Sequence, residues 1–126
     1  MNLTRVLDLQ AEWAKITGGS ARFPMAGLVM PGKLVDEHPE LVAAIRAEVA
    51  ATVAKANSGD EATIAAIATQ YDLPEALVKD VISRLQLDVV PASEARAEYE
   101  DFLRRPGEDN PKIYGGKLPD DTFYAD

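Results

Sequence analysis

Acid–base and nucleophilic chemistry have few candidate residues in this chain of 126 residues. His38 is its single histidine and cysteine is absent, which excludes histidine clusters, thiolate ligands, cysteine nucleophiles and disulfides. Asp36, Glu37 and Glu40 surround His38 and could form a proton relay with it. The same residues suit a polar turn before a helix that opens at Pro39, because carboxylates stabilise the positive end of a helix dipole. We favour the turn.

Other polar motifs lack the geometry that their chemistry needs. Adjacent carboxylates at 108–109 and 120–121 would diverge in a loop, whereas a metal site or a glycosidase needs convergent carboxylates. The run at 115–117 (GGK) lacks the earlier glycine, the following Ser or Thr and the following helix of a phosphate-binding loop. We therefore expect no enzymatic activity, no metal and no cofactor.

Nucleic-acid binding is disfavoured by charge. The segment 63–85 has the pattern of two helices joined by a tight turn, as in DNA-binding helix–turn–helix domains. Its second helix presents Glu75, Lys79, Asp80 and Arg84, whose charges nearly cancel. The whole chain has 21 acidic and 13 basic side chains and a net charge of -8, which repels a phosphate backbone.

The spacing of hydrophobic residues predicts about five helices, which would position the polar and charged side chains described above. The expected helices cover about 4–16, 39–57, 61–70 and 74–85, with a fifth that Ser93 caps and that ends near Arg105. Pro39 suits a first helical position, Gly59 suits a helix end, and Asp60 suits an N-cap. The apolar face expected to be buried on the fourth helix comprises Leu77, Val78, Val81, Ile82 and Leu85.

Two short apolar runs, 23–30 and 87–90, predict brief strands, the first closed by a turn at Pro31 and Gly32. Two short strands cannot form a stable sheet unaided. They either pair with each other beneath the helices or pair with strands outside this chain. The expected fold is thus one mainly α domain over 1–126 with two short strands, and an irregular tail over 106–126 packs on it.

We expect neither an export signal nor a membrane segment within this chain. Polar residues interrupt the first positions, so the start lacks the apolar stretch of a signal peptide. No run approaches the apolar length that spans a bilayer. As given, the chain is expected to be soluble, not inserted in a membrane, and cytoplasmic.

Three stretches, in this order, resemble the nitrate/sulfonate/taurine class of periplasmic solute-binding proteins of ABC transporters, a group that includes thiamine-precursor-binding relatives. They are 8–18 (DLQAEWAKITG) with 25–30 (MAGLVM), then 37–44 (EHPELVAA), and finally 110–124 (NPKIYGGKLPDDTFY). Family members carry an element similar to the GGKLPDD run at their C-terminus. The resemblance covers nearly the whole chain. The family usually has a charged residue where Pro31 and Gly32 stand here.

The resemblance implies a C-terminal portion of a two-lobed α/β protein that is more than twice this length. It implies a small solute, such as an organic anion, bound between the lobes, an ABC-transporter permease as partner, and a periplasmic location. Met25, Ala26 and Gly27 would lie beside the cleft, where the chain returns to the first lobe. One wall of the cleft would not bind solute by itself.

The alternative is a free-standing helical interaction module. In either case we expect self-association, because exposed strand edges and apolar faces favour pairing between copies.

Overall fold

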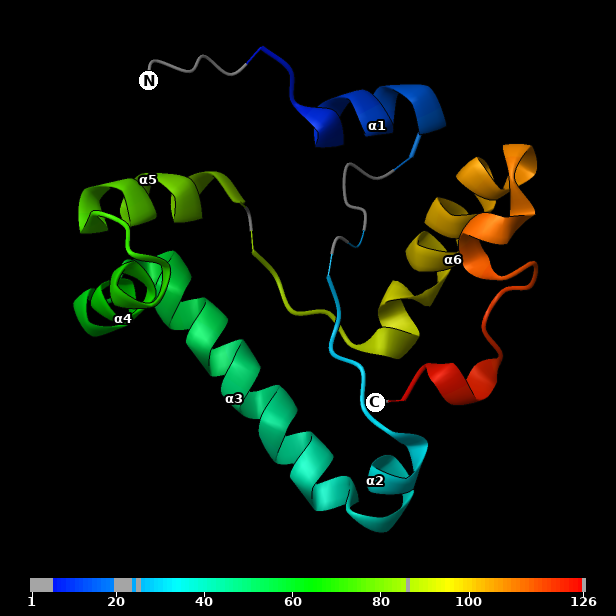
Figure 1. Ribbon diagram of the computed structural model, residues 1–126, viewed down its shortest axis with the longest axis horizontal. Coiled ribbons are helices and arrows are strands. Elements are labelled where there is room, and N and C mark those ends of the chain that lie inside the picture. The colour runs from blue at the N-terminus through cyan, green and yellow to red at the C-terminus, as the bar shows by residue number, and fades with distance from the viewer. Residues whose placement is uncertain (1–5, 20–23, 25, 86, 126) are drawn as a thin grey trace. The chain divides into compact units, whose positions relative to one another are not determined.

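The computed structural model describes residues 6–19, 24, 26–85 and 87–125. Within these ranges the chain forms six α-helices, two short 3-10 helices and no β-strand (Figure 1). The mainly helical prediction is therefore confirmed and the two strands are wrong for the described residues. The elements are α1 (Leu9–Thr17), α2 (Gly32–Glu37), α3 (Pro39–Ser58), α4 (Glu61–Tyr71), α5 (Glu75–Leu85), α6 (Ala92–Asp109), η1 (Pro111–Tyr114) and η2 (Asp121–Phe123).

The chain divides into two compact units. The first combines Met1–Val29 with Pro91–Asp126 and holds α1, α6, η1 and η2, while the second is Met30–Val90 and holds α2 to α5. The prediction of one domain over 1–126 stays a prediction.

Capping residues set the ends of the central helices as the sequence predicts. Pro39 is the first residue of α3, and Gly59 ends that helix in the left-handed region with φ 74°. The Asp60 side chain then accepts a hydrogen bond from the Thr63 backbone N–H at 2.9 Å and so starts α4. The left-handed region costs glycine least, which is why α3 stops there.

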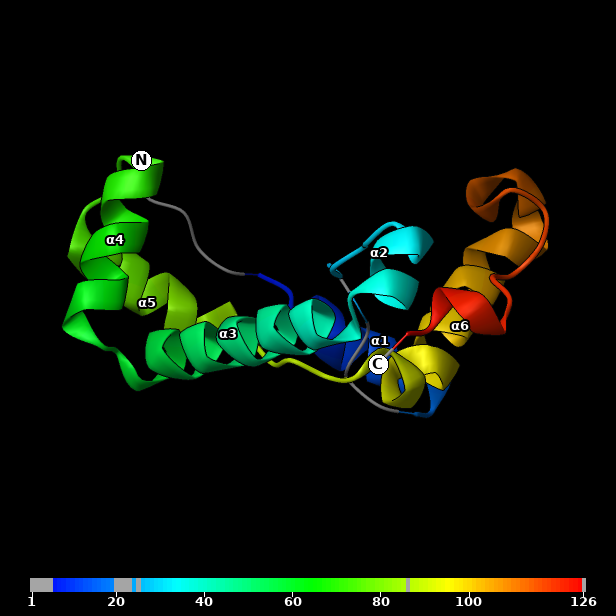
Figure 2. The same ribbon diagram turned by 90° about the horizontal axis from the view of Figure 1, so that it is seen from below.

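The core of the second unit is small and lies between α4 and α5, which run side by side at the end of α3 (Figure 2). Ile64 is fully buried, and Ala68 and Val78 are buried beside it. The predicted buried face of α5 is mostly wrong: Leu77, Val81 and Leu85 are 43%, 40% and 50% exposed. These three residues lie on the flank of α5 next to the side that meets α4, where they are only partly covered.

The predicted strands are irregular segments. Residues 26–30 and 87–90 have neither helix nor strand, and the remainder of the first predicted strand, except Pro24, lies outside the described residues. Leu28 and Val29 are 60% and 80% exposed, so the described residues cover little of the surface of these two side chains. Leu87 is held instead by its carbonyl, which accepts a hydrogen bond from Asn57 Nδ2 at 2.9 Å.

Several predicted helix ends are also corrected. Helix α1 begins at Leu9, because the Asp8 side chain accepts hydrogen bonds from the backbone N–H groups of Gln10 and Ala11. The predicted start at Thr4 lies outside the described residues. Pro31 and Gly32 do not form a simple turn but open the short helix α2. Ser93 is not the cap of α6, which starts at Ala92 after Pro91.

The first unit is built on α6. Trp13 of α1 packs on Phe102 with ring centroids 5.6 Å apart. At the C-terminal end of α6, buried Gly107 allows the Tyr114 ring of η1 to pack directly on the helix backbone. The tail is therefore more regular than predicted: α6 continues through Pro106 to Asp109, and η1 and η2 follow.

Candidate functional site

The predicted ligand-binding residues are only partly covered by the structure. Met25 lies outside the described residues, while Ala26 and Gly27 are exposed on a segment without helix or strand. A Cβ added to Gly27 would meet no atom within 4 Å. Ala26 and Gly27 therefore form no enclosed wall within the described part of the chain, and nothing local requires a glycine at position 27.

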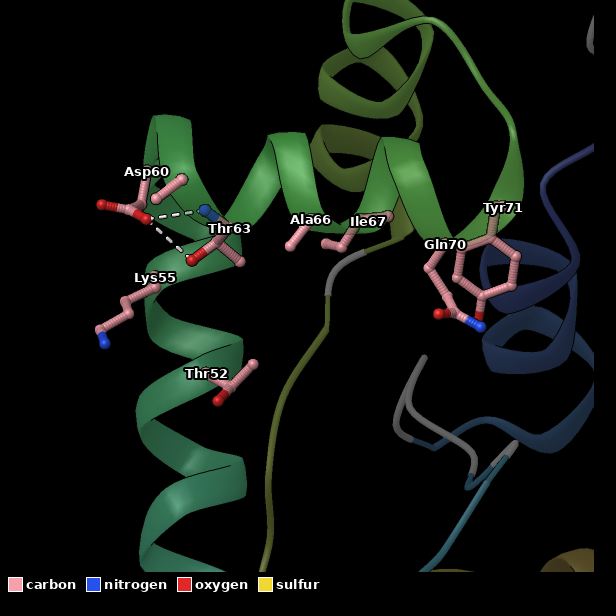
Figure 3. Close-up of a pocket in the computed structure, with 9 residues that line it drawn as sticks. Thr52, Lys55, Asp60, Thr63, Ala66, Ile67, Gln70 and Tyr71 are labelled. Atoms are coloured by element: carbon pink, nitrogen blue, oxygen red, sulfur yellow. Dashed lines mark hydrogen bonds between the residues drawn. The ribbon is translucent and has the colours of Figure 1, made fainter.

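A groove that the sequence did not indicate lies in the second unit, between α3 and α4 (Figure 3). Its volume is about 540 Å³ and it is open to solvent. Thr52 and Lys55 line it from α3, and Tyr71 lines the far end of α4. The remaining lining residues are Asp60, Ala62, Thr63, Ala66, Ile67 and Gln70. Alanine and threonine on facing helix surfaces leave this space because their side chains are small.

At the charged end of the groove, Asp60 and Thr63 form the N-terminal cap of α4. Asp60 accepts hydrogen bonds from both the backbone N–H and the hydroxyl of Thr63, at 2.9 and 2.8 Å. These two hydrogen bonds, the backbone one first, lower the pKa of Asp60, and Lys55 adds a smaller electrostatic contribution. A carboxylate with a lowered pKa is a weaker base, so this pair is suited to starting α4 and poorly suited to activating the hydroxyl.

A denser polar cluster lies in the first unit and involves α6 and η2. Arg96 donates to Glu100 at 2.8 Å and to Asp121 at 2.7 Å, and its guanidinium lies 4.7 Å from the centre of the Tyr124 ring. Arg104 binds the second oxygen of Glu100 at 2.8 Å. The cluster fastens the C-terminal residues to α6.

The charges in this cluster stabilise one another. The hydrogen bond from Arg96 is the largest cause that lowers the pKa of Glu100, and the hydrogen bond to Glu100 raises the pKa of Arg96. The Tyr124 hydroxyl is buried beside Glu100 without a hydrogen bond of good geometry among the described residues, and burial raises its pKa. Each charged group of the cluster is thus paired with an opposite charge.

The sequence could have revealed part of this cluster. Arg96, Glu100 and Arg104 follow at steps of four, which is the spacing of ion pairs along one helix face. The contact from Arg96 to Asp121 spans 25 positions, and no local pattern predicts it.

His38 lies between α2 and α3 with its side chain exposed, and its Nδ1 is 3.6 Å from a Glu40 oxygen. Among the described residues, no group of histidine, aspartate and glutamate side chains could hold a metal ion. None of the helices described is both long and apolar enough to cross a membrane.

Comparisons with protein-family models, curated proteins and solved structures find no match to this chain. The family resemblance therefore rests on the residues that carry it.

Proposed function

We propose that this chain is the C-terminal portion of the periplasmic solute-binding component of an ABC importer for small organic anions or related solutes. The observation that carries the proposal is the run 110–124, which follows two other family-like stretches in the family's order. Helix openings such as 37–44 recur easily in unrelated proteins. The seven-residue run GGKLPDD at 115–121 is much more specific, because seven consecutive residues match an element that family members carry at the C-terminus.

The conformation of the tail, residues 110–124, supports the proposal that it is a folded element with a defined structure. Asn110 accepts from the Lys112 N–H and caps η1, and Asp120 accepts from the Thr122 N–H and caps η2. Both glycines, Gly115 and Gly116, have positive φ, which explains why this pair suits the turn after η1. The tail is thus tied down by its own specific residues.

The exposure of Leu28 and Val29 in the run 26–30 supports the proposal that this run packs against a part of a longer protein. Leu28 and Val29 have the residue types of a buried strand, yet most of their surface is exposed. In a longer protein this run would join the sheet of the first lobe, and Met25, Ala26 and Gly27 would stand at the edge of the cleft. The solute would lie between the lobes, and the permease would receive it.

The test is a thermal-shift screen of the protein that the full reading frame around these residues encodes. The panel is taurine, other sulfonates, nitrate and pyrimidine precursors. A true solute at a hundred times its Kd stabilises the folded protein by about 2.7 kcal/mol. Gly27→Trp should abolish that shift by filling the cleft edge, whereas Ala54→Trp, on an exposed position of α3, should retain it. The proposal fails when no solute of the panel raises the melting temperature, or when Gly27→Trp binds as well as wild type.

A second candidate is a free-standing helical interaction module. One observation favours it: the second unit packs α4 and α5 around its own buried residue, Ile64, while apolar side chains of α5 stay exposed. This module would associate with itself or a partner without any solute. A reading frame with no two-lobed protein around these residues would favour it over the transport role.

A further inference from the structure

The exposed side of α5 carries three apolar residues at steps of four, Leu77, Val81 and Leu85. Residues four apart lie on one face of an α-helix, so the three form a continuous line along it. Their exposed fractions lie between 40% and 50%. We call this line the α5 stripe.

The stripe has one charged flank and one core flank. With an advance of about 100° per residue, Val78 and Ile82 fall on one side of the stripe, where they pack towards α4. Asp80 and Arg84 fall on the other side, and both are more than half exposed. Their side chains pair with each other at 2.7 Å, so the flank carries one negative and one positive charge in a row.

We propose that the α5 stripe pairs with the α5 stripe of a second copy of this chain, with the two helices antiparallel. Two-fold symmetry places the same flank of both helices side by side. When the two-fold axis passes at the level of residue 82, Asp80 of the first copy lies level with Arg84 of the second. Arg84 of the first copy then lies level with Asp80 of the second. The row of two opposite charges is therefore complementary to itself.

The same register also interleaves the apolar residues. Counted from residue 82, the stripe residues of one copy lie five and one positions before it and three positions after it. In the antiparallel copy these offsets are reversed. The six side chains then alternate between the helices at intervals of two residues, or about 3 Å. They fit between one another without meeting head on, so packing and charge select the same register.

Each copy has a net charge of -8, so electrostatic repulsion opposes the association of two copies. Copies that approach through their acidic surfaces repel each other. The α5 stripe avoids this repulsion because its charged flank is neutral in total. The inference is independent of the proposed transport role.

The first measurement is the mass of this chain by light scattering and sedimentation over a wide concentration range. A dimer that forms on raising the concentration is expected. Val81→Glu places a charge near the centre of the interface and should weaken the dimer by roughly tenfold or more. Lys79→Glu changes a residue on the opposite face of α5 and should leave the dimer unchanged. A monomer at every concentration overturns the proposal.

Charge exchange tests the register itself. Asp80→Arg and Arg84→Asp each place like charges across the interface, so each variant should dimerise more weakly than wild type. Mixed together, the two variants restore opposite charges across the interface although both have lost the Asp80–Arg84 pair within the helix. Native mass spectrometry with one isotope-labelled variant should therefore show mixed dimers above the fraction expected of random pairing. Random pairing, with circular dichroism showing both variants folded, would refute this antiparallel contact.

Discussion

The packing of η1 on α6 makes a quantitative prediction about Gly107→Ala. Gly107 is buried within α6, and a Cβ built on it would overlap the ring of Tyr114. Replacing glycine by alanine in a helix normally gains about 1 kcal/mol. Overpacking against a well-placed ring costs about 1–3 kcal/mol. We expect the cost to exceed the gain, with a net loss of up to about 2 kcal/mol in the free energy of unfolding of the first unit.

The sign of the effect should reverse when the ring is removed. In a Tyr114→Ala background, Gly107→Ala meets no ring and should stabilise the protein by roughly 0.5–1 kcal/mol. The coupling energy of this double-mutant cycle then equals the cost of overpacking, about 1–3 kcal/mol. Helix propensity acts equally in both backgrounds, so the coupling measures the contact between residue 107 and the ring.

Trp13 offers a reporter that belongs to the same unit. It is the only tryptophan, it packs on Phe102, and the Arg105 guanidinium lies 5.5 Å from its ring centre. Urea unfolding followed by its fluorescence gives the free energies of the four proteins. Equal effects of Gly107→Ala in the two backgrounds would refute the packing of η1 against α6.

Three further predictions concern the core, the C-terminal cluster and a helix cap. Ile64→Ala should lower the free energy of unfolding by roughly 2–4 kcal/mol because Ile64 is fully buried. Thermal unfolding followed by circular dichroism measures this loss, and a loss no larger than that of Ile64→Val would contradict the prediction. Arg96→Gln should speed hydrogen exchange at residues 121–124 while helix content stays constant, since it releases Asp121; unchanged exchange would show that the cluster does not hold the tail. The pKa of Asp60 is lowered from its usual 3.8, so its stabilising effect is present above about that pH and is lost as pH falls through the lower, folded value. Asp60→Asn keeps a capping oxygen that does not titrate and should make the acid-induced loss of stability smaller; an unchanged acid profile would contradict the assignment.

The helices could be predicted from the sequence where local capping chemistry decides. Pro39, Gly59 and Asp60 each act on the backbone within a few residues, and the ends of α3 and the start of α4 follow from them. Helix α2 is only six residues long and lacks a side-chain cap. No periodic pattern of that length distinguishes a helix from a turn, which is why Pro31 and Gly32 were expected to form a turn.

The strands and the buried face of α5 could not be predicted correctly because they depend on partners. Leu28 and Val29 favour a strand, but a strand needs a neighbour to accept its hydrogen bonds, and none is found among the described residues. Periodicity likewise shows that Leu77 and Val81 share a face with Val78. It does not show how much of that face another helix covers.

The candidate sites divide in the same way. The pairing of Arg96, Glu100 and Arg104 is readable from their spacing. The attachment of Asp121 and the groove beside Thr52 depend on tertiary contacts, and no sequence motif marks them. The cleft position of Ala26 and Gly27 rests on the resemblance and stays a prediction.

The transport role is tested most directly by calorimetric titration of one solute into two proteins, this chain and the protein of its full reading frame. The account predicts that the longer protein binds an organic anion or related solute with one site. It predicts no heat of binding for the chain of 126 residues, because one wall of a cleft leaves most of the solute in water. Binding by the shorter chain, or by neither protein across the whole solute panel, would contradict the account.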